Sequence, residues 1–122
     1  MAVRLHNPGY EYARKLIDGG HVVLDDRDAW SEHQPSAREE NEFIAEHGWD
    51  AYGRWHLGVD HEKRKDTKEH WKFPYGDFKD VHRCAVLSAE SRAAQRNYDD
   101  VKTAVAHLHG MLEALRASAR TS

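Results

Sequence analysis

Histidines are the residues of this chain with the most obvious capacity for chemistry. The 122-residue sequence contains ten of them, roughly twice the number expected from ordinary composition, and they are scattered along the chain. The imidazole ring is a common ligand of Zn²⁺ and Ni²⁺. His56 and His70 stand in two segments in which polar and apolar residues alternate, a pattern typical of half-buried strands. If these segments pair, the imidazoles lie close together, because cross-strand Cβ atoms are about 4.5–5.5 Å apart.

A surface site follows from this pairing. Arg54, His56, His70 and Lys72 occupy the polar positions of the two segments, so we expect them to face solvent together. Within this group, His56 and His70 are the predicted ligands of a divalent metal, zinc or nickel. The alternative is a pair of ordinary exposed or interface histidines. The choice between the two depends on the register of the strands.

Two further groups of reactive side chains lack the spacing of a metal site. His107 and His109 are two positions apart and point to opposite sides of a helix, whereas His109 and Glu113 are four apart and are predicted to form a surface ion pair. The Asp-His-Glu run at 60–62 would need a histidine at position 65 to match a zinc-protease motif, and Lys65 stands there. We interpret that run as a solvated loop.

Cys84 is the single cysteine, so no disulfide can form within the chain and a reducing compartment is expected. The first residues lack the apolar run of a signal peptide, and no window has the length of a membrane span. We therefore expect a cytoplasmic protein without membrane contact. His82 precedes Cys84 by two positions, and on a helix such side chains diverge. This spacing predicts a buried, inert thiol instead of a thiolate–imidazole pair.

Basic residues gather in the segment 63–72. They are Lys63, Arg64, Lys65, Lys68 and Lys72. Nucleic-acid binding through this loop would place the lysines on phosphates and aromatic side chains on bases. Interleaved acidic residues cancel most of its charge, and the whole chain carries a net charge of −3. We therefore rank nucleic-acid binding below the other functions.

Capping residues and periodicity predict the N-terminal helices. Asn7-Pro8-Gly9 begins a first helix, with Asn7 as its cap. Polar residues from 25 to 34 indicate a loop with at most one helical turn. Ser36 and Glu39 have the spacing of a capping box and begin the next helix.

The two alternating segments predict an antiparallel β-hairpin with an apolar inner face. Its inward residues are Trp55, Leu57, Val59, Trp71 and Phe73. Small apolar residues from 81 to 94 then predict a helix, and a regular apolar stripe from 101 to 115 predicts the last one. We expect these two helices to pack as an antiparallel pair.

Together these elements predict an α+β fold that is mainly helical, with about four helices and a small antiparallel β-hairpin. One domain spans residues 1–122. Its parts are an N-terminal helical region at 1–48, the aromatic hairpin at 49–76, the C-terminal helix pair at 77–117 and a frayed tail at 118–122.

The middle of the chain is similar to small uncharacterised proteins of actinobacteria. The residues that carry the resemblance are Trp55–Asp60, Lys72–Phe78 and Val81–Arg83. More distantly, the chain resembles a module of phage head-maturation and structural proteins. The likeness covers about residues 49–115. It implies an accessory or interaction module and brings no catalytic residue with it.

Three functions follow from the sequence, in this order. The first is a non-enzymatic interaction or assembly module that binds another copy of itself or another protein. The predicted helix at 81–94 has a face of small residues that a partner could approach, and the sequence contains no motif typical of a catalytic site. The second is a histidine-rich protein that binds a metal or small ligand, or a small metalloenzyme, with its site centred on His56 and His70. The third is nucleic-acid binding through the 63–72 loop.

Overall fold

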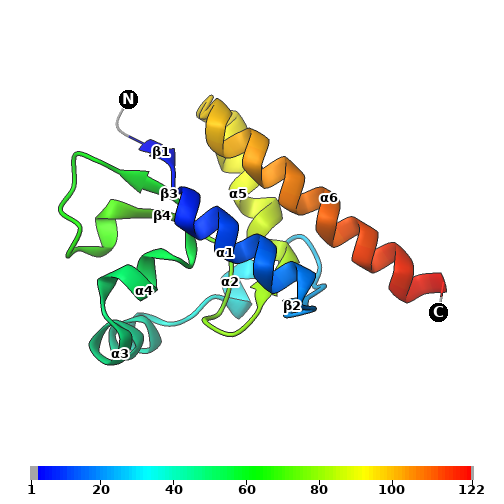
Figure 1. Ribbon diagram of the computed structural model, residues 1–122, viewed down its shortest axis with the longest axis horizontal. Coiled ribbons are helices and arrows are strands. Elements are labelled where there is room, and N and C mark those ends of the chain that lie inside the picture. The colour runs from blue at the N-terminus through cyan, green and yellow to red at the C-terminus, as the bar shows by residue number, and fades with distance from the viewer. Residues whose placement is uncertain (1–2, 122) are drawn as a thin grey trace.

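Helices dominate the computed structural model, which describes residues 3–121 (Figure 1). The helices are α1 (Asn7–Asp18), α2 (Trp30–His33), α3 (Ala37–His47), α4 (Trp49–Gly53), α5 (Arg83–Gln95) and α6 (Asp99–Thr121), with a 3₁₀ turn, η1 (Lys68–His70). The strands are β1 (Val3–Leu5), β2 (Val22–Val23), β3 (His56–Asp60), β4 (Trp71–Pro74) and β5 (Val81–His82). The α+β class is as predicted. The described residues form six α-helices instead of about four, because α2 and α4 are too short to leave a periodic signal.

A three-stranded antiparallel sheet contains the predicted hairpin. β3 pairs with β4, and Gly58 lies opposite Lys72. β1 adds a third strand on the other edge of β3, which makes β3 the central strand. Residues 56–59 of β3 are all buried, so both faces of this strand are covered. β2 and β5 form a separate parallel pair, with Val23 opposite His82.

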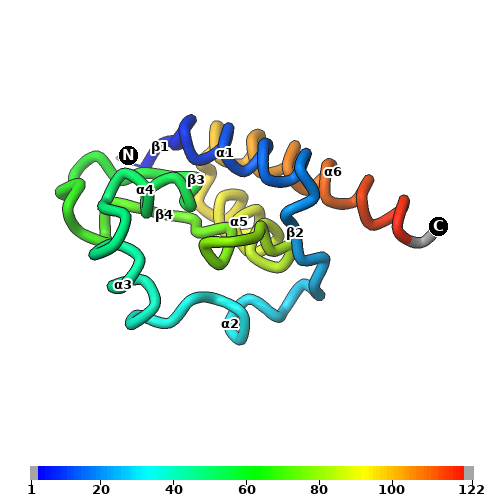
Figure 2. Tube along the Cα trace, turned by 60° about the horizontal axis from the view of Figure 1, so that its bottom comes forward, coloured from blue at the N-terminus to red at the C-terminus, as the bar shows by residue number. Residues whose placement is uncertain are grey.

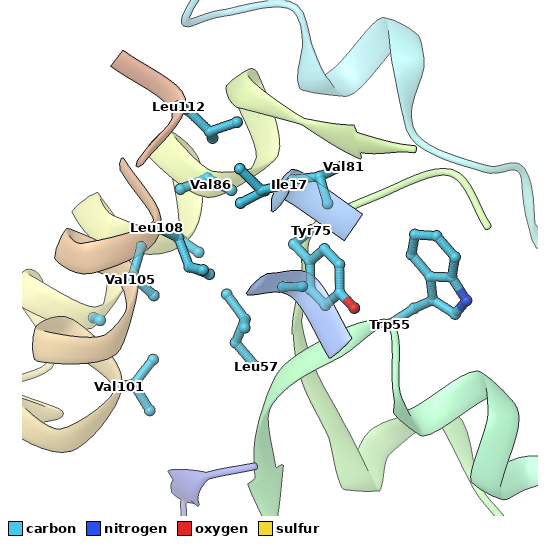
Figure 3. Close-up of a cluster of buried hydrophobic side chains, with 13 residues drawn as sticks. Ile17, Trp55, Leu57, Tyr75, Val81, Val86, Val101, Val105, Leu108 and Leu112 are labelled. Atoms are coloured by element: carbon cyan, nitrogen blue, oxygen red, sulfur yellow. The ribbon is translucent and has the colours of Figure 1, made fainter. Parts of the chain in front are cut away.

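The main core lies between α1, the sheet and the helix pair α5–α6 (Figure 3). Its largest fully buried side chains include Tyr75, Leu57, Leu108 and Leu112. The helix pair is antiparallel, because Arg83 at the start of α5 contacts Glu113 late in α6, and Glu90 further along α5 contacts His109 earlier in α6. Ala89 and Ala93 of α5 are buried in the same core cluster as Val105 and Leu108 of α6, and their small side chains let the two helices approach closely.

The segment between β2 and α3 lies on the opposite side of α5 from α1 and α6 (Figure 2). It carries α2, which contains no buried residue. An element with so little apolar burial gains little from the hydrophobic effect. The position of α2 against α5 therefore depends largely on polar contacts.

The helix termini confirm one predicted cap and correct another. Ser36 and Glu39 form the capping box at the start of α3. α1 already includes Asn7, so the residue at its N-cap is His6, whose side chain makes no capping bond. α6 continues to Thr121, past the predicted start of the frayed tail at residue 118, and Ala119 and Arg120 within this stretch are strong helix formers. Ser122 lies outside the described residues.

Phe73 departs from the predicted inward face of the hairpin. The other predicted inward residues are buried as expected: Trp55, Leu57, Val59 and Trp71. Phe73 has a φ of 59°, in the left-handed region that bulky residues rarely adopt. Its ring lies over Gly58, where an added Cβ would come within 2.8 Å of it. Gly58 and Lys72 are cross-strand partners, so their Cβ positions lie on the same face of the sheet. The left-handed backbone of Phe73 turns its ring onto this face, although Phe73 directly follows Lys72.

Candidate metal-binding site

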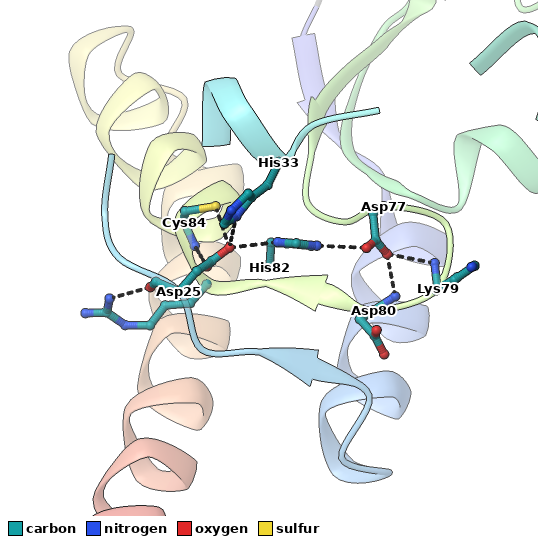
Figure 4. A network of polar contacts seen from close by, with 8 residues as sticks. Asp25, His33, Asp77, Lys79, Asp80, His82 and Cys84 are labelled. Carbon is teal, nitrogen blue, oxygen red and sulfur yellow. Dashed lines mark hydrogen bonds and ion pairs between the residues drawn. The ribbon is translucent and has the colours of Figure 1, made fainter. Parts of the chain in front are cut away.

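Four side chains that bind metals well meet beside the N-terminus of α5 (Figure 4). Asp25, His33, His82 and Cys84 each offer one ligand atom, and these atoms all lie within 4.8 Å of one another. Asp25 comes from the loop after β2, and His33 ends α2. His82 ends β5, and Cys84 stands in the first turn of α5. The cluster thus joins the segment 25–33 to residues 82–84, which lie about 50 residues further along the chain.

Asp25 is the centre of this cluster. Nδ1 of His33 and Nδ1 of His82 each lie 2.7 Å from its Oδ2, and the Cys84 thiol donates a hydrogen bond of 3.0 Å to the same oxygen. The backbone N–H of Cys84 donates to Oδ1 over 2.8 Å. The Asp25 and His82 side chains are each 7% exposed, whereas His33 is 39% exposed. The cluster is therefore mostly shielded, with His33 as its solvent-facing member.

The β2–β5 pairing positions Asp25. It aligns Val23 with His82, so the residues after each strand emerge side by side. Arg83 then donates through Nη1 to the Asp25 carbonyl over 3.0 Å. Because Cys84 lies in the first turn of α5, its bond to Oδ1 makes Asp25 a cap supplied from outside the helix. The positive end of the helix dipole favours this carboxylate.

Asp77 supports the cluster from behind. Its Oδ2 lies 2.9 Å from Nε2 of His82, and its Oδ1 accepts hydrogen bonds from the backbone N–H groups of Lys79 and Asp80. These bonds orient the carboxylate and leave His82 to donate its Nε2 proton to Asp77. The Nδ1 atom of His82 faces the cluster, where it now contacts Asp25, and it is the nitrogen that could bind a metal ion in place of that contact. A carboxylate behind a histidine is the usual support of a metal-ligating imidazole.

The pKa values of these groups reflect their mutual contacts. Burial alone would raise the pKa of Asp25, but hydrogen bonds from Cys84, His82 and His33 lower it to about 2. Burial would lower the pKa of His82, but the carboxylates of Asp77 and Asp25 raise it. Burial, together with the Asp25 carboxylate, raises the pKa of the Cys84 thiol to about 12. Without a bound cation, the thiol therefore keeps its proton at neutral pH.

This arrangement suits metal binding better than nucleophilic catalysis. A nucleophilic cysteine needs an imidazole that takes its proton, but both ring nitrogens of His82 face carboxylates and the thiol faces Asp25. A cation at the centre would instead draw together one thiolate, two imidazoles and one carboxylate. That set of donors matches the four-coordinate preference of Zn²⁺.

The structure separates the four residues of the predicted surface site. The register places His56 opposite Pro74, while His70 lies in η1 before β4, so the two histidines are not cross-strand neighbours. Both are 3% exposed. Nδ1 of His56 lies 2.9 Å from the Tyr52 carbonyl, and Nδ1 of His70 lies 2.9 Å from the Lys63 carbonyl.

The prediction that His56 and His70 face solvent together with Arg54 and Lys72 is therefore wrong. The central strand β3 has no solvent-facing side, because β1 and the helices cover the face that would be exposed in an isolated hairpin. Arg54 is exposed and lies over the Tyr12 ring, at 5.5 Å from its centroid. Lys72 lines a pocket on the sheet. A metal-binding role for His56 and His70 gains no support from this geometry.

His82 and Cys84 were missed because of one wrong boundary. The prediction placed both on a helix, where residues two apart diverge. α5 begins at Arg83, and His82 has extended backbone angles (φ −98°, ψ 125°), so both side chains turn toward Asp25. Cys84 is buried, as predicted. Asp25 and His33 had no sequence signal, because His82 and Cys84 lie about 50 or more residues further along the chain.

The remaining sequence candidates form ordinary polar contacts. Nε2 of His109 lies 3.6 Å from Glu113, which confirms the predicted ion pair. In the basic segment, Arg64 pairs with Asp66 at 2.7 Å. Trp71 is buried, as predicted for a core residue, and its indole N–H donates to the Lys65 carbonyl.

No family model, curated protein or solved structure matches this chain. Within residues 3–121, no helix combines the length and the apolar character needed to cross a bilayer.

Proposed function

We propose that this protein is a zinc-binding domain in which Zn²⁺ is held by Asp25, His33, His82 and Cys84. The observation that carries the proposal is the convergence of four ligand atoms of three kinds within 4.8 Å of one another. A sulfur, two imidazole nitrogens and a carboxylate oxygen match the ligands found in tetrahedral zinc sites. Soft thiolate and borderline imidazole ligands disfavour Mg²⁺ and Ca²⁺.

Charge balance supports the assignment. A Zn²⁺ ion with the Cys84 thiolate, the Asp25 carboxylate and two neutral imidazoles has no net charge, which suits a mostly buried position. Binding of the ion displaces the thiol proton, as zinc does at cysteine ligands generally. The hydrogen bonds that now converge on Asp25 are then replaced by bonds to the metal.

The structure favours a structural role for the ion. All four coordination positions come from the protein, and a zinc site that is closed in this way supports folding. The ligands connect the loop after β2, the exposed helix α2 and the start of α5. Zinc would therefore fix the segment that has little apolar burial of its own.

Zinc analysis of untagged protein tests the proposal. We expect one zinc per chain after exchange against dilute chelator, measured by native mass spectrometry. His33→Ala should weaken zinc binding by more than the roughly 10–100-fold that loss of a merely supporting residue causes. Because His33 is exposed, this change leaves the core intact.

His47→Ala is the matched control. His47 also ends a helix and is similarly exposed, but it lies outside the cluster. We expect its zinc content to equal that of the unmodified protein. Wild-type protein without zinc, or equal zinc loss in both variants, would contradict the proposal.

The interaction or assembly role stays a separate prediction, as do a homo-oligomeric state, nucleic-acid binding and the resemblance to actinobacterial and phage proteins. Of the small residues of α5 that motivated self-association, Cys84 is buried within this chain, whereas Ser91 and Ala94 are exposed. A zinc-stabilised domain is compatible with binding another protein.

A further inference from the structure

A pocket of about 320 Å³ lies where the three-stranded sheet meets the C-terminal end of α5. It shares no residue with the zinc cluster. Three of its lining residues are cationic: Lys72 from β4, Arg92 from the last turn of α5 and Arg96 just after it. Its size is at the lower end of the range for small-molecule sites, which is about 300–1,000 Å³.

The three cationic side chains have no hydrogen-bond or ion-pair partner among residues 3–121. Elsewhere in the chain, Lys63 pairs with Glu69, and Lys68 pairs with Glu40. Arg92 and Arg96 are also one helical turn apart, a spacing at which like charges repel. An anion between them would remove this repulsion and satisfy the guanidinium donors, which suit phosphate in particular.

Strand register explains why Lys72 and Asp60 reach the same pocket. Lys72 lies opposite Gly58, and Asp60 lies two residues beyond Gly58 on the same face of β3. Asp60 is the one carboxylate among the residues that line the pocket. A carboxylate beside three cations can accept hydrogen bonds from hydroxyl groups of an anionic ligand.

Two aromatic rings complete the pocket. Phe73 and Tyr98 meet edge to face, with ring centroids 6.1 Å apart. Phe73 reaches this position through its left-handed backbone, a conformation that bulky residues rarely adopt. Aromatic rings beside cations are a common way to hold the base and the phosphate of a nucleotide.

We propose that this pocket binds a nucleoside monophosphate or a phosphate monoester of similar size and aromatic character. Arg92, Arg96 and Lys72 would hold the phosphate. Phe73 and Tyr98 would contact the aromatic part, and Asp60 would accept hydrogen bonds from sugar hydroxyls. The proposal rests on this pocket alone and does not depend on zinc.

Calorimetric titration of the full chain at low ionic strength tests the proposal. The probes are adenosine 5′-monophosphate, adenosine and inorganic phosphate. We expect saturable binding of one adenosine 5′-monophosphate per chain, with the other two probes bound about tenfold or more weakly. Arg96→Gln should weaken binding about tenfold or more, because a hydrogen bond to a charged group is lost. Arg96 is exposed, so the variant folds normally, which circular dichroism checks.

Two controls make the outcome decisive. Arg38→Gln removes the same charge from α3, outside the pocket, and should leave affinity within about twofold, as surface substitutions usually do. The second control is the zinc content of Arg96→Gln, which should equal that of the unmodified protein and so separates this site from the zinc site. Absence of nucleotide binding, equal binding of inorganic phosphate or adenosine, or equal losses in Arg96→Gln and Arg38→Gln would each overturn the proposal.

Discussion

Asp25 joins parts of the chain that no local sequence pattern connects. Its side chain accepts hydrogen bonds from the backbone and thiol of Cys84, 59 residues away, and its carbonyl accepts one from Arg83. Capping boxes such as that of Ser36 and Glu39 can be predicted because both partners lie within one turn. A cap supplied from a distant loop cannot be predicted in this way, since its spacing depends on tertiary structure.

Asp77 gives a prediction at the scale of one residue. Asp77→Asn keeps an oxygen that can accept from the backbone of Lys79 and Asp80, but it removes the negative charge that faces His82. Supporting carboxylates hold the metal-bound imidazole and increase its basicity, so zinc affinity should fall roughly 10–100-fold. Competition with a fluorescent zinc chelator measures this change. An affinity equal to that of the unmodified protein would show that Asp77 does not support a metal ligand.

At the scale of elements, segments with a clear alternation or apolar stripe were predicted well, and segments without one were not. The alternating residues of β3 and β4 and the stripe of α6 gave the right element types. β1, with three residues, and α2, with four, are held by their neighbours and carry no signal of their own. The absence of β1 from the prediction is what made the covered face of β3 look like a surface.

The packing of α6 on α5 gives a prediction for this scale. Leu108 is fully buried in the main core, so Leu108→Ala should lower the free energy of unfolding by about 2–5 kcal/mol. Urea denaturation followed by circular dichroism measures this change. Lys102→Ala, at an exposed position of the same helix, should change stability by less than about 0.5 kcal/mol. Similar losses in both variants would argue against the packing described for α6.

At the scale of the whole molecule, zinc binding is linked to folding. The four proposed ligands meet only when β2, α2 and α5 are in place, so the unfolded chain binds zinc weakly. Free zinc at about 100 times its dissociation constant should add about 2.7 kcal/mol to the free energy of unfolding. For a chain of this length that raises Tm by roughly 10 °C. Differential scanning fluorimetry of Cys84→Ala should show no such increase.

Acid should destabilise the metal-free protein through His6 and His56. Burial and the nearby His70 and His61 lower the pKa of His6 to about 4, and burial lowers that of His56 to about 3. Their unfolded values are about 6.5, so between about pH 6.5 and 4 the unfolded state binds more protons and stability falls as pH falls. Each histidine contributes at most about 1.4 kcal/mol per pH unit, and less where water reaches the ring.

Urea denaturation in chelator at pH 7 and pH 5 measures this dependence. His82 acts in the opposite sense, since its raised pKa adds stability below about pH 6.5, and it offsets part of the loss. We expect lower stability at pH 5 and a weaker pH dependence in His6→Gln. Equal or greater stability at pH 5 would mean that His6 and His56 are not held neutral in the folded protein.

The most direct test of the zinc assignment is a crystal structure of the zinc-loaded protein with anomalous data collected at the zinc absorption edge. We predict one strong anomalous peak per chain, about 2.3 Å from Sγ of Cys84 and about 2.0–2.2 Å from ligand atoms of Asp25, His33 and His82. Nε2 of His82 should remain hydrogen-bonded to Asp77. A loaded crystal with no peak among these four residues, or with its peak at His56 or His70, would contradict the account.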